Sequence, residues 1–158
     1  MTTTNAASIH HTKISVSDMD RSLHFYCDVL GFKLIYDVFR DDPPAYRTIM
    51  GFDKVQVRIA MLRDENERCM IGLLQFTEPA PTGSPMPVNS IGFVTIAVEV
   101  GDIQAVCESI EREKIKTISP PVDIERNGKC VARAMYVFDP DGLQIELYQA
   151  MVAIEDAS

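Results

Sequence analysis

An imidazole and a carboxylate, two groups suited to acid–base or metal chemistry, stand in different copies of a motif that occurs twice in this chain. Aligned on their final aspartates, the segments Ile9–Asp18 and Phe93–Asp102 agree at their apolar positions. His11 of the first copy then falls on Thr95 of the second. The first copy therefore keeps an imidazole that the second lacks.

A later part of the motif shows the opposite loss. Residues 71–75 match residues 145–149, and Gly72 in the first copy stands where the second has Glu146. A histidine from one half and a glutamate from the other predict a cleft built between two halves. Two copies of the motif would supply four polar side chains to such a cleft, and the changes at Thr95 and Gly72 leave half of this set missing.

The surroundings of these two side chains leave a functional and a passive interpretation open. His11 lies on an alternating segment opposite Ile14 and Val16, which we expect to pack under a helix, so it faces the cleft as a metal ligand or general base. The alternative is a polar residue inherited in an unused pocket. Glu146 lies between two apolar residues, and a cleft carboxylate beside an apolar wall is suited to proton transfer. Its alternative is a solvated glutamate on an open sheet face.

Other polar residues are weaker candidates. Arg58 and Arg133 lie mid-strand in the two halves, where each can bind an anionic group of a ligand, and surface ion pairing is an equal alternative. Tyr148 and Thr95 are candidates to donate hydrogen bonds to a bound oxyanion. The second imidazole, His10, has the alternation of the helix-facing residues, and we expect it to be structural.

The elements that must position these residues follow the order β-α-β-β-β twice. Pro79, Pro81, Gly83, Pro85 and Pro87 predict an irregular connector over residues 77–90, between modules 8–76 and 91–149. Aspartate caps and apolar spacing predict one helix in each module, the first capped by Asp18 or Asp20. The expected strands are 8–16, 32–39, 55–62 and 69–76, then 91–100, 115–119, 131–138 and 143–149, with helices at 18–30 and 102–113.

Composition limits the classes of function. The chain has 158 residues, a formal net charge of −8 and a pI of about 4.8. This charge argues against nucleic acid and anionic membrane surfaces as partners, because both attract basic proteins. The first residues do not resemble a signal peptide, and no apolar run reaches the length of a membrane span. Four widely spaced cysteines predict reduced thiols in a cytoplasmic protein.

Two signatures carry a resemblance to a known family. They are His11-x-x-Ile14-x-Val16-x-Asp18-Met19-x-x-Ser22-x-x-Phe25-Tyr26-x-x-x-Leu30-Gly31-Phe32 and Asp139-Pro140-Asp141-Gly142-x-x-Ile145-Glu146-Leu147. The chain thereby resembles the vicinal oxygen chelate superfamily of glyoxalases, methylmalonyl-CoA epimerases, extradiol dioxygenases and fosfomycin and bleomycin resistance proteins. Its layout is closest to the glyoxalase and epimerase branch. The resemblance implies one α+β domain over residues 1–158, in which two tandem βαβββ modules form a half-open, barrel-like mixed sheet around a cleft. It also implies a homodimer.

The resemblance further implies a divalent metal held by the first and last strand of each module. Carried over by position, the four ligand sites are His11, Gly72, Thr95 and Glu146, of which only His11 and Glu146 bind a metal well. We therefore expect either weak binding of Mn, Fe, Mg, Ni, Co or Zn at these two residues, or no cofactor. The predicted function is an isomerase, epimerase or lyase acting on a small carbonyl, enol or aromatic substrate. The alternative is a metal-free binding protein of the bleomycin-resistance type.

Overall fold

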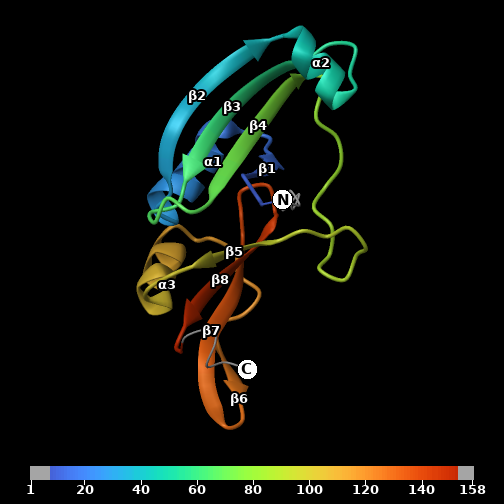
Figure 1. The fold of residues 1–158 in the computed structure, drawn as a ribbon. Coiled ribbons are helices and arrows are strands. Elements are labelled where there is room, and N and C mark those ends of the chain that lie inside the picture. Colours follow the sequence, from blue (N-terminus) through green and yellow to red (C-terminus); the bar gives the residue numbers. More distant parts are fainter. Residues whose placement is uncertain (1–7, 153–158) are drawn as a thin grey trace, which may run out of the picture. The chain divides into compact units, whose positions relative to one another are not determined.

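The fold was analysed in a computed structural model, which describes residues 8–152. The chain forms two compact units that divide between Thr82 and Gly83, inside the connector expected at 77–90 (Figure 1). Each unit contains one open four-stranded mixed sheet and at least one helix, so the predicted α+β class is confirmed. No helix within residues 8–152 is long and apolar enough to cross a membrane.

The first unit has the strand order β1-β4-β3-β2, with β1 parallel to β4 and the other pairs antiparallel. The side chain of Asp18 accepts a hydrogen bond from the Arg21 amide and begins the first helix, as one of the two predicted caps. The buried side of that helix carries Met19, Phe25 and Tyr26. The elements are β1 (Thr12–Ser15), α1 (Met19–Leu23), the π-helical turn η1 (His24–Val29), β2 (Lys33–Asp41), α2 (Pro44–Met50), β3 (Gln56–Arg63) and β4 (Met70–Glu78).

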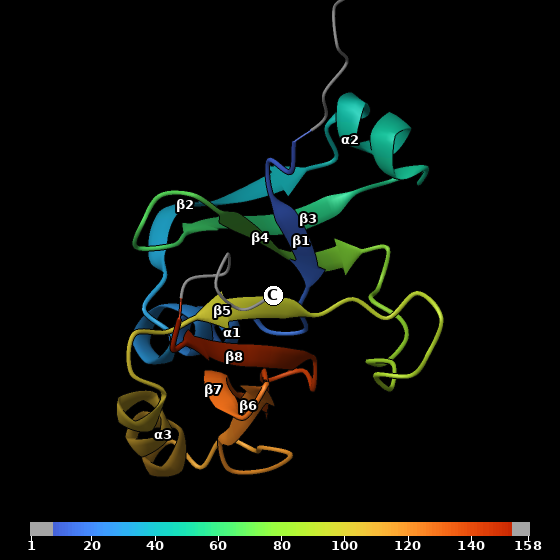
Figure 2. The same ribbon diagram turned by 60° about the horizontal axis from the view of Figure 1, so that its bottom comes forward.

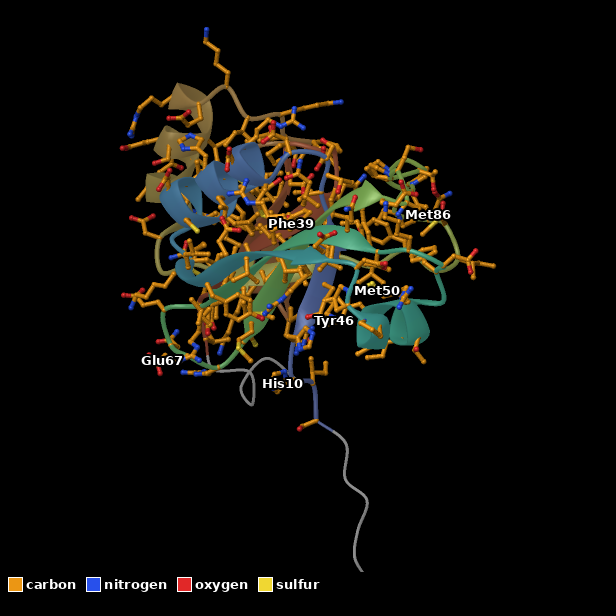
Figure 3. All side chains as sticks on the ribbon, turned by 90° about the horizontal axis from the view of Figure 1, so that it is seen from above. His10, Phe39, Tyr46, Met50, Glu67 and Met86 are labelled. Carbon is orange, nitrogen blue, oxygen red and sulfur yellow. The ribbon has the colours of Figure 1, made fainter. Side chains whose placement is uncertain are left out.

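Helix α2 is an element that the sequence analysis did not predict. Its start at Pro44 and its stop at Gly51, whose φ is 73°, follow the preference for proline in the first turn and glycine after the last. Tyr46 and Met50 of this helix pack against an apolar cluster that includes Ile59 and Leu74 of the sheet (Figure 3). The helix therefore covers part of one face of the first sheet.

The second unit repeats the plan with the order β5-β8-β7-β6 (Figure 2). The predicted strand at 115–119 is wrong except for an isolated bridge between Thr117 and Val137, because the edge strand is β6 instead. Asn127 and Gly128, with φ of 51° and 73°, make the turn from β6 to β7, as expected of an Asn-Gly hairpin. The elements are β5 (Ile96–Glu99), α3 (Ile103–Arg112), β6 (Val122–Arg126), β7 (Lys129–Phe138) and β8 (Gln144–Ala150).

Equivalent glutamines attach the first helix of each unit to its sheet. Gln75 of β4 accepts a hydrogen bond from the Met19 amide, and Gln149 of β8 accepts one from the Ile103 amide, at 3.1 and 3.2 Å. Because side chains alternate along a strand, the residues one and three places before each glutamine lie on the opposite face from it. We call the glutamine side the helix face and the other side the open face; in the first unit, α2 covers the part of the open face around Ile59 and Leu74. Gly72 and Glu146 lie on the open faces of their own units.

Candidate functional site

The open face of the second unit carries a carboxylate between a small residue and a phenol. Glu146 on β8 stands opposite Ala97 on β5 and opposite Tyr136 on β7, and residues paired in this way share one face. Glu146 is half-buried, as is Tyr148 two places along the same face. This row places a proton acceptor and hydroxyl groups side by side within one unit.

Tyr136 is a residue that sequence reasoning missed. Burial raises the pKa of its phenol, and the negative charge of Glu146 raises it further. The hydroxyl therefore stays protonated at neutral pH and can donate a hydrogen bond. The alternation of β7 assigns Tyr136 to one face, but only the pairing register of β7 with β8 brings it opposite Glu146.

Thr95 is committed to the backbone of its own unit. Its Oγ1 donates a hydrogen bond to the carbonyl oxygen of Gln144 at 2.7 Å. The hydroxyl proton is therefore already engaged in a hydrogen bond. The oxygen could offer a metal only the lone pairs of an uncharged hydroxyl group. This arrangement makes Thr95 a poor replacement for an imidazole as a metal ligand.

In the first unit, the half-buried His11 lies just before β1. Its Nδ1 is 2.8 Å from Nδ1 of His10, so one ring donates to the other. His10 itself is exposed and precedes β1, so it is not part of the packed core. Burial lowers the pKa of His11, as do the positive charges of Lys13 and His10. His11 is therefore neutral at physiological pH, which is the state that binds a metal or accepts a proton.

Gly72 leaves the open face of the first unit without a carboxylate at its β4 position. It is buried, and a Cβ added there would lie 3.4 Å from Cγ of Lys13 and 3.5 Å from Cε of Met61. The register explains both contacts, because Lys13 of β1 and Met61 of β3 flank Gly72 in the sheet. The place of the missing side chain is thus bordered by a cationic and an apolar residue.

The two candidate arginines lie on the helix faces, opposite the faces that carry Gly72 and Glu146. Arg58 is paired with Gln75, and Arg133 with Gln149, the glutamines that hold the helices. Arg58 donates to Asp37 through Nε and Nη2 at 2.9 and 2.6 Å, and Nη2 also lies 2.8 Å from Asp20. The geometry supports the ion-pairing alternative for Arg58, and ligand contact stays a prediction.

Arg133 repeats the arrangement in the second unit in a weaker form. Its Nε donates to Asp123 of the edge strand β6 at 2.6 Å, and both side chains are largely exposed. Pairing with Asp123 raises the pKa of the guanidinium, and the same contact lowers the pKa of Asp123. The structure therefore brings Tyr148 to the face of Glu146 and places Arg133 on the other side of the same sheet.

Comparison with known proteins decides the family. The model of the glyoxalase/bleomycin resistance protein/dioxygenase superfamily matches residues 8–147. The chain belongs to this superfamily. A glyoxalase family protein from Bacillus cereus has the same fold, with a TM-score of 0.84 at 21% identity, over 96% of this chain and 99% of that one.

Two curated members of the superfamily give the range of activities among relatives. A probable lactoylglutathione lyase of Synechocystis is 33% identical over 143 residues, which cover 88% of this chain and 92% of the relative. A 2-epi-5-epi-valiolone epimerase of an Actinomyces species is 27% identical over 146 residues, 90% of this chain and 79% of the relative. A lyase and an epimerase are thus among the similar proteins.

Divalent metals are common in this superfamily, so we compared the donors of each unit with the needs of a metal. Within neither unit do the described residues form a group of three or more His, Cys, Asp or Glu side chains that could hold an ion. The first unit offers His11 beside the side-chain-free Gly72, and the second offers Glu146 beside the occupied hydroxyl of Thr95. Protein metal sites usually have three or four strong donors, so neither unit alone fits a resident metal.

Proposed function

We propose that this superfamily member is an enzyme that moves a proton next to a carbonyl or enol group of a small molecule, as an isomerase, epimerase or lyase. The observation that supports it most directly is the open-face row of the second unit, where Glu146 lies opposite the protonated phenol of Tyr136. A carboxylate and a neutral hydroxyl are the parts that enolisation requires. The lyase and epimerase relatives support the same class of reaction.

In the proposed reaction, Glu146 acts as the base. Its carboxylate takes the proton from the carbon next to the carbonyl, and the electron pair of that C–H bond forms the enolate. The hydroxyls of Tyr136 and Tyr148 donate hydrogen bonds to the enolate oxygen, and these bonds strengthen as negative charge develops there. The carboxylic acid then returns the proton to the neighbouring carbon, which isomerises the substrate. For epimerisation, a second acid or water protonates the same carbon from the opposite face, and Glu146 gives its proton to solvent.

His11 is the second acid–base residue of the proposal. Its lowered pKa makes it an acceptor at neutral pH, so the first unit can take a proton from a hydroxyl group of a bound small molecule. As a metal ligand, the role of His11 would be limited to weak, labile binding. We further propose that the protein works as a homodimer in the cytoplasm, which size-exclusion chromatography with light scattering and fractionation of cells would test.

A metal-free binding protein is the second candidate function. It is favoured by the loss of donor groups at Gly72 and Thr95, because sequestration of a ligand needs no metal. The two candidates differ in what Glu146 does. Replacing it should abolish turnover in an enzyme and leave ligand affinity largely intact in a binder.

The test is a turnover screen with matched variants. Wild-type protein, Glu146→Gln and Glu99→Gln are assayed on the hemithioacetal of glutathione and methylglyoxal and on chiral 2-substituted 3-oxoacids. Glu99 is an exposed carboxylate on the same face of the same sheet, so it controls for a change of charge. We expect Glu146→Gln to lower kcat by about 10²-fold or more, and Glu99→Gln to keep it. Equal rates in wild type and Glu146→Gln would contradict the proposal.

A further inference from the structure

The first unit carries a lysine in the strand pair that corresponds to the pair containing Glu146 in the second unit. In the second unit, Ala97 of β5 flanks Glu146 of β8; in the first, Lys13 of β1 flanks Gly72 of β4. Aligning the two copies of the motif on their aspartates puts Lys13 on Ala97. The charge carried by this pair of positions is therefore reversed between the halves.

The methylene chain of Lys13 borders the space that a side chain at position 72 would take. Its Cγ lies 3.4 Å from the place of that Cβ, and Cε of Met61 lies 3.5 Å from it on the other side. A long aliphatic stem can pack along apolar surface while its ammonium stays in water. Gly72 thus allows the lysine to lie across β4 on the open face.

In the described part of the chain, no acidic residue lies beside this ammonium on the sheet. The neighbours of Lys13 on the open face are Gly72 and Met61 in its own row, Ser15 and Leu74 in the row after it, and Met70 and Arg63 in the row before it. Within residues 8–152, Lys13 makes no ion pair, although the chain has 23 acidic and 15 basic residues. An exposed, unpaired cation beside an apolar wall has its hydrogen-bond donors available for a ligand.

The neighbouring imidazole adds to the same surface. His11 lies two residues before Lys13, and its Nδ1 is engaged with His10. A neutral ring beside an ammonium can accept or donate a hydrogen bond, while the ammonium supplies the charge.

We propose that Lys13 binds a small carboxylate or enediolate anion on the open face of the first unit above Gly72. This inference rests on the proposed function only for the class of the ligand, a small oxo compound. A lysine ammonium suits this role as a compact charge with three donors, without fixed geometry.

Met61 provides a reporter for the test. Protein labelled with ¹³C in the methionine methyl groups is titrated with oxalate, a planar dianion that resembles an enediolate, and the Met61 signal is assigned with Met61→Leu. Lys13→Gln removes the charge, Lys13→Arg keeps it, and Lys54→Gln is the control at another exposed lysine of the same unit. The remaining methionine signals report whether each variant is folded.

We expect oxalate to shift the Met61 signal in a saturable way. The dissociation constant should rise about tenfold or more in Lys13→Gln, because a hydrogen bond to a charged group is lost. It should stay near the wild-type value in Lys13→Arg and Lys54→Gln. No saturable shift in wild type, or equal affinity in Lys13→Gln, would overturn the inference.

Because this assay measures binding alone, its result is separable from that of the turnover screen. Charge-dependent oxalate binding in a protein without Glu146-dependent turnover would refute the enzyme proposal and keep the anion site. Turnover that depends on Glu146, with oxalate affinity unchanged in Lys13→Gln, would refute the anion site alone.

Discussion

Replacing Arg58 by methionine should destabilise the first unit and leave ligand affinity unchanged. Arg58 donates three hydrogen bonds to Asp37, two from Nε at 2.9 and 3.2 Å and one from Nη2 at 2.6 Å, and the side chains of Arg58 and Asp37 are 33% and 24% exposed. Hydrogen bonds to charged groups contribute about 1.5–3 kcal/mol when buried, and solvent screening reduces this pair to about 1–2 kcal/mol. Asp20 is 81% exposed, so its contact adds less than about 0.5 kcal/mol.

The assay is urea unfolding of wild type, Arg58→Met, Asp37→Asn and the double variant. The coupling energy from this cycle should be about 1–2 kcal/mol. In thermal melts of the same variants, Tm should fall by about 2–4 °C for each kcal/mol lost. Arg133→Met is the matched control, since the same strand position of the second unit carries one contact to the exposed Asp123. Its effect on Tm should be smaller than that of Arg58→Met.

The same variants decide between the two interpretations of these arginines. If Arg58 contacts the ligand, then Arg58→Met should raise KM or the oxalate dissociation constant about tenfold or more without a matching loss of stability. That result would refute the assignment of Arg58 to the helix face as a structural ion pair.

Three further outcomes are expected. Gly72→Glu should fold, because Cγ of Lys13 lies 3.4 Å from the added Cβ and the lysine side chain can move. The new carboxylate should pair with Lys13 and weaken oxalate binding, whereas Gly72→Gln should not weaken it. Equal oxalate affinity in both variants would contradict this prediction. Burial and positive neighbours lower the pKa of His11, so the unfolded chain binds this proton more readily than the folded protein. The free energy of unfolding should therefore be highest above about pH 6.5 and should decline as the pH falls below it. His11→Gln should flatten this decline in urea titrations at pH 7.5 and 5. Gly128→Ala should cost about 1 kcal/mol because φ is 73° there, while Gly101→Ala should be neutral in the same melts, and equal costs would argue against the Asn-Gly turn.

The sequence predicted the elements whose patterns are local. Asp18 as a helix cap and the alternation of β3 and β8 follow from neighbouring residues, and the structure contains them. Two errors also had local signals that were not used. Proline followed by glycine about two helical turns later marks α2, and Asn127-Gly128 marks the β6–β7 hairpin.

The candidate site depended more on pairing between strands, which one sequence does not specify. Alternation assigned Glu146 and Tyr148 to one face, but the partner strand's register brought Tyr136 opposite Glu146. The position of Arg58 on its strand revealed nothing of Asp20 and Asp37, which come from other elements. The significance of Lys13 likewise appears only where β1 lies beside Gly72.

The most direct test of the central claim is exchange of substrate hydrogen with solvent. Wild-type protein, Glu146→Gln and Glu99→Gln are incubated in D₂O with the hemithioacetal of glutathione and methylglyoxal and with a chiral 2-substituted 3-oxoacid, and deuterium at the carbon next to the carbonyl is followed by NMR. The account predicts enzyme-dependent exchange that Glu99→Gln keeps and Glu146→Gln lowers by about 10²-fold or more. Exchange at the wild-type rate in Glu146→Gln, or none above buffer in the wild type, would contradict it.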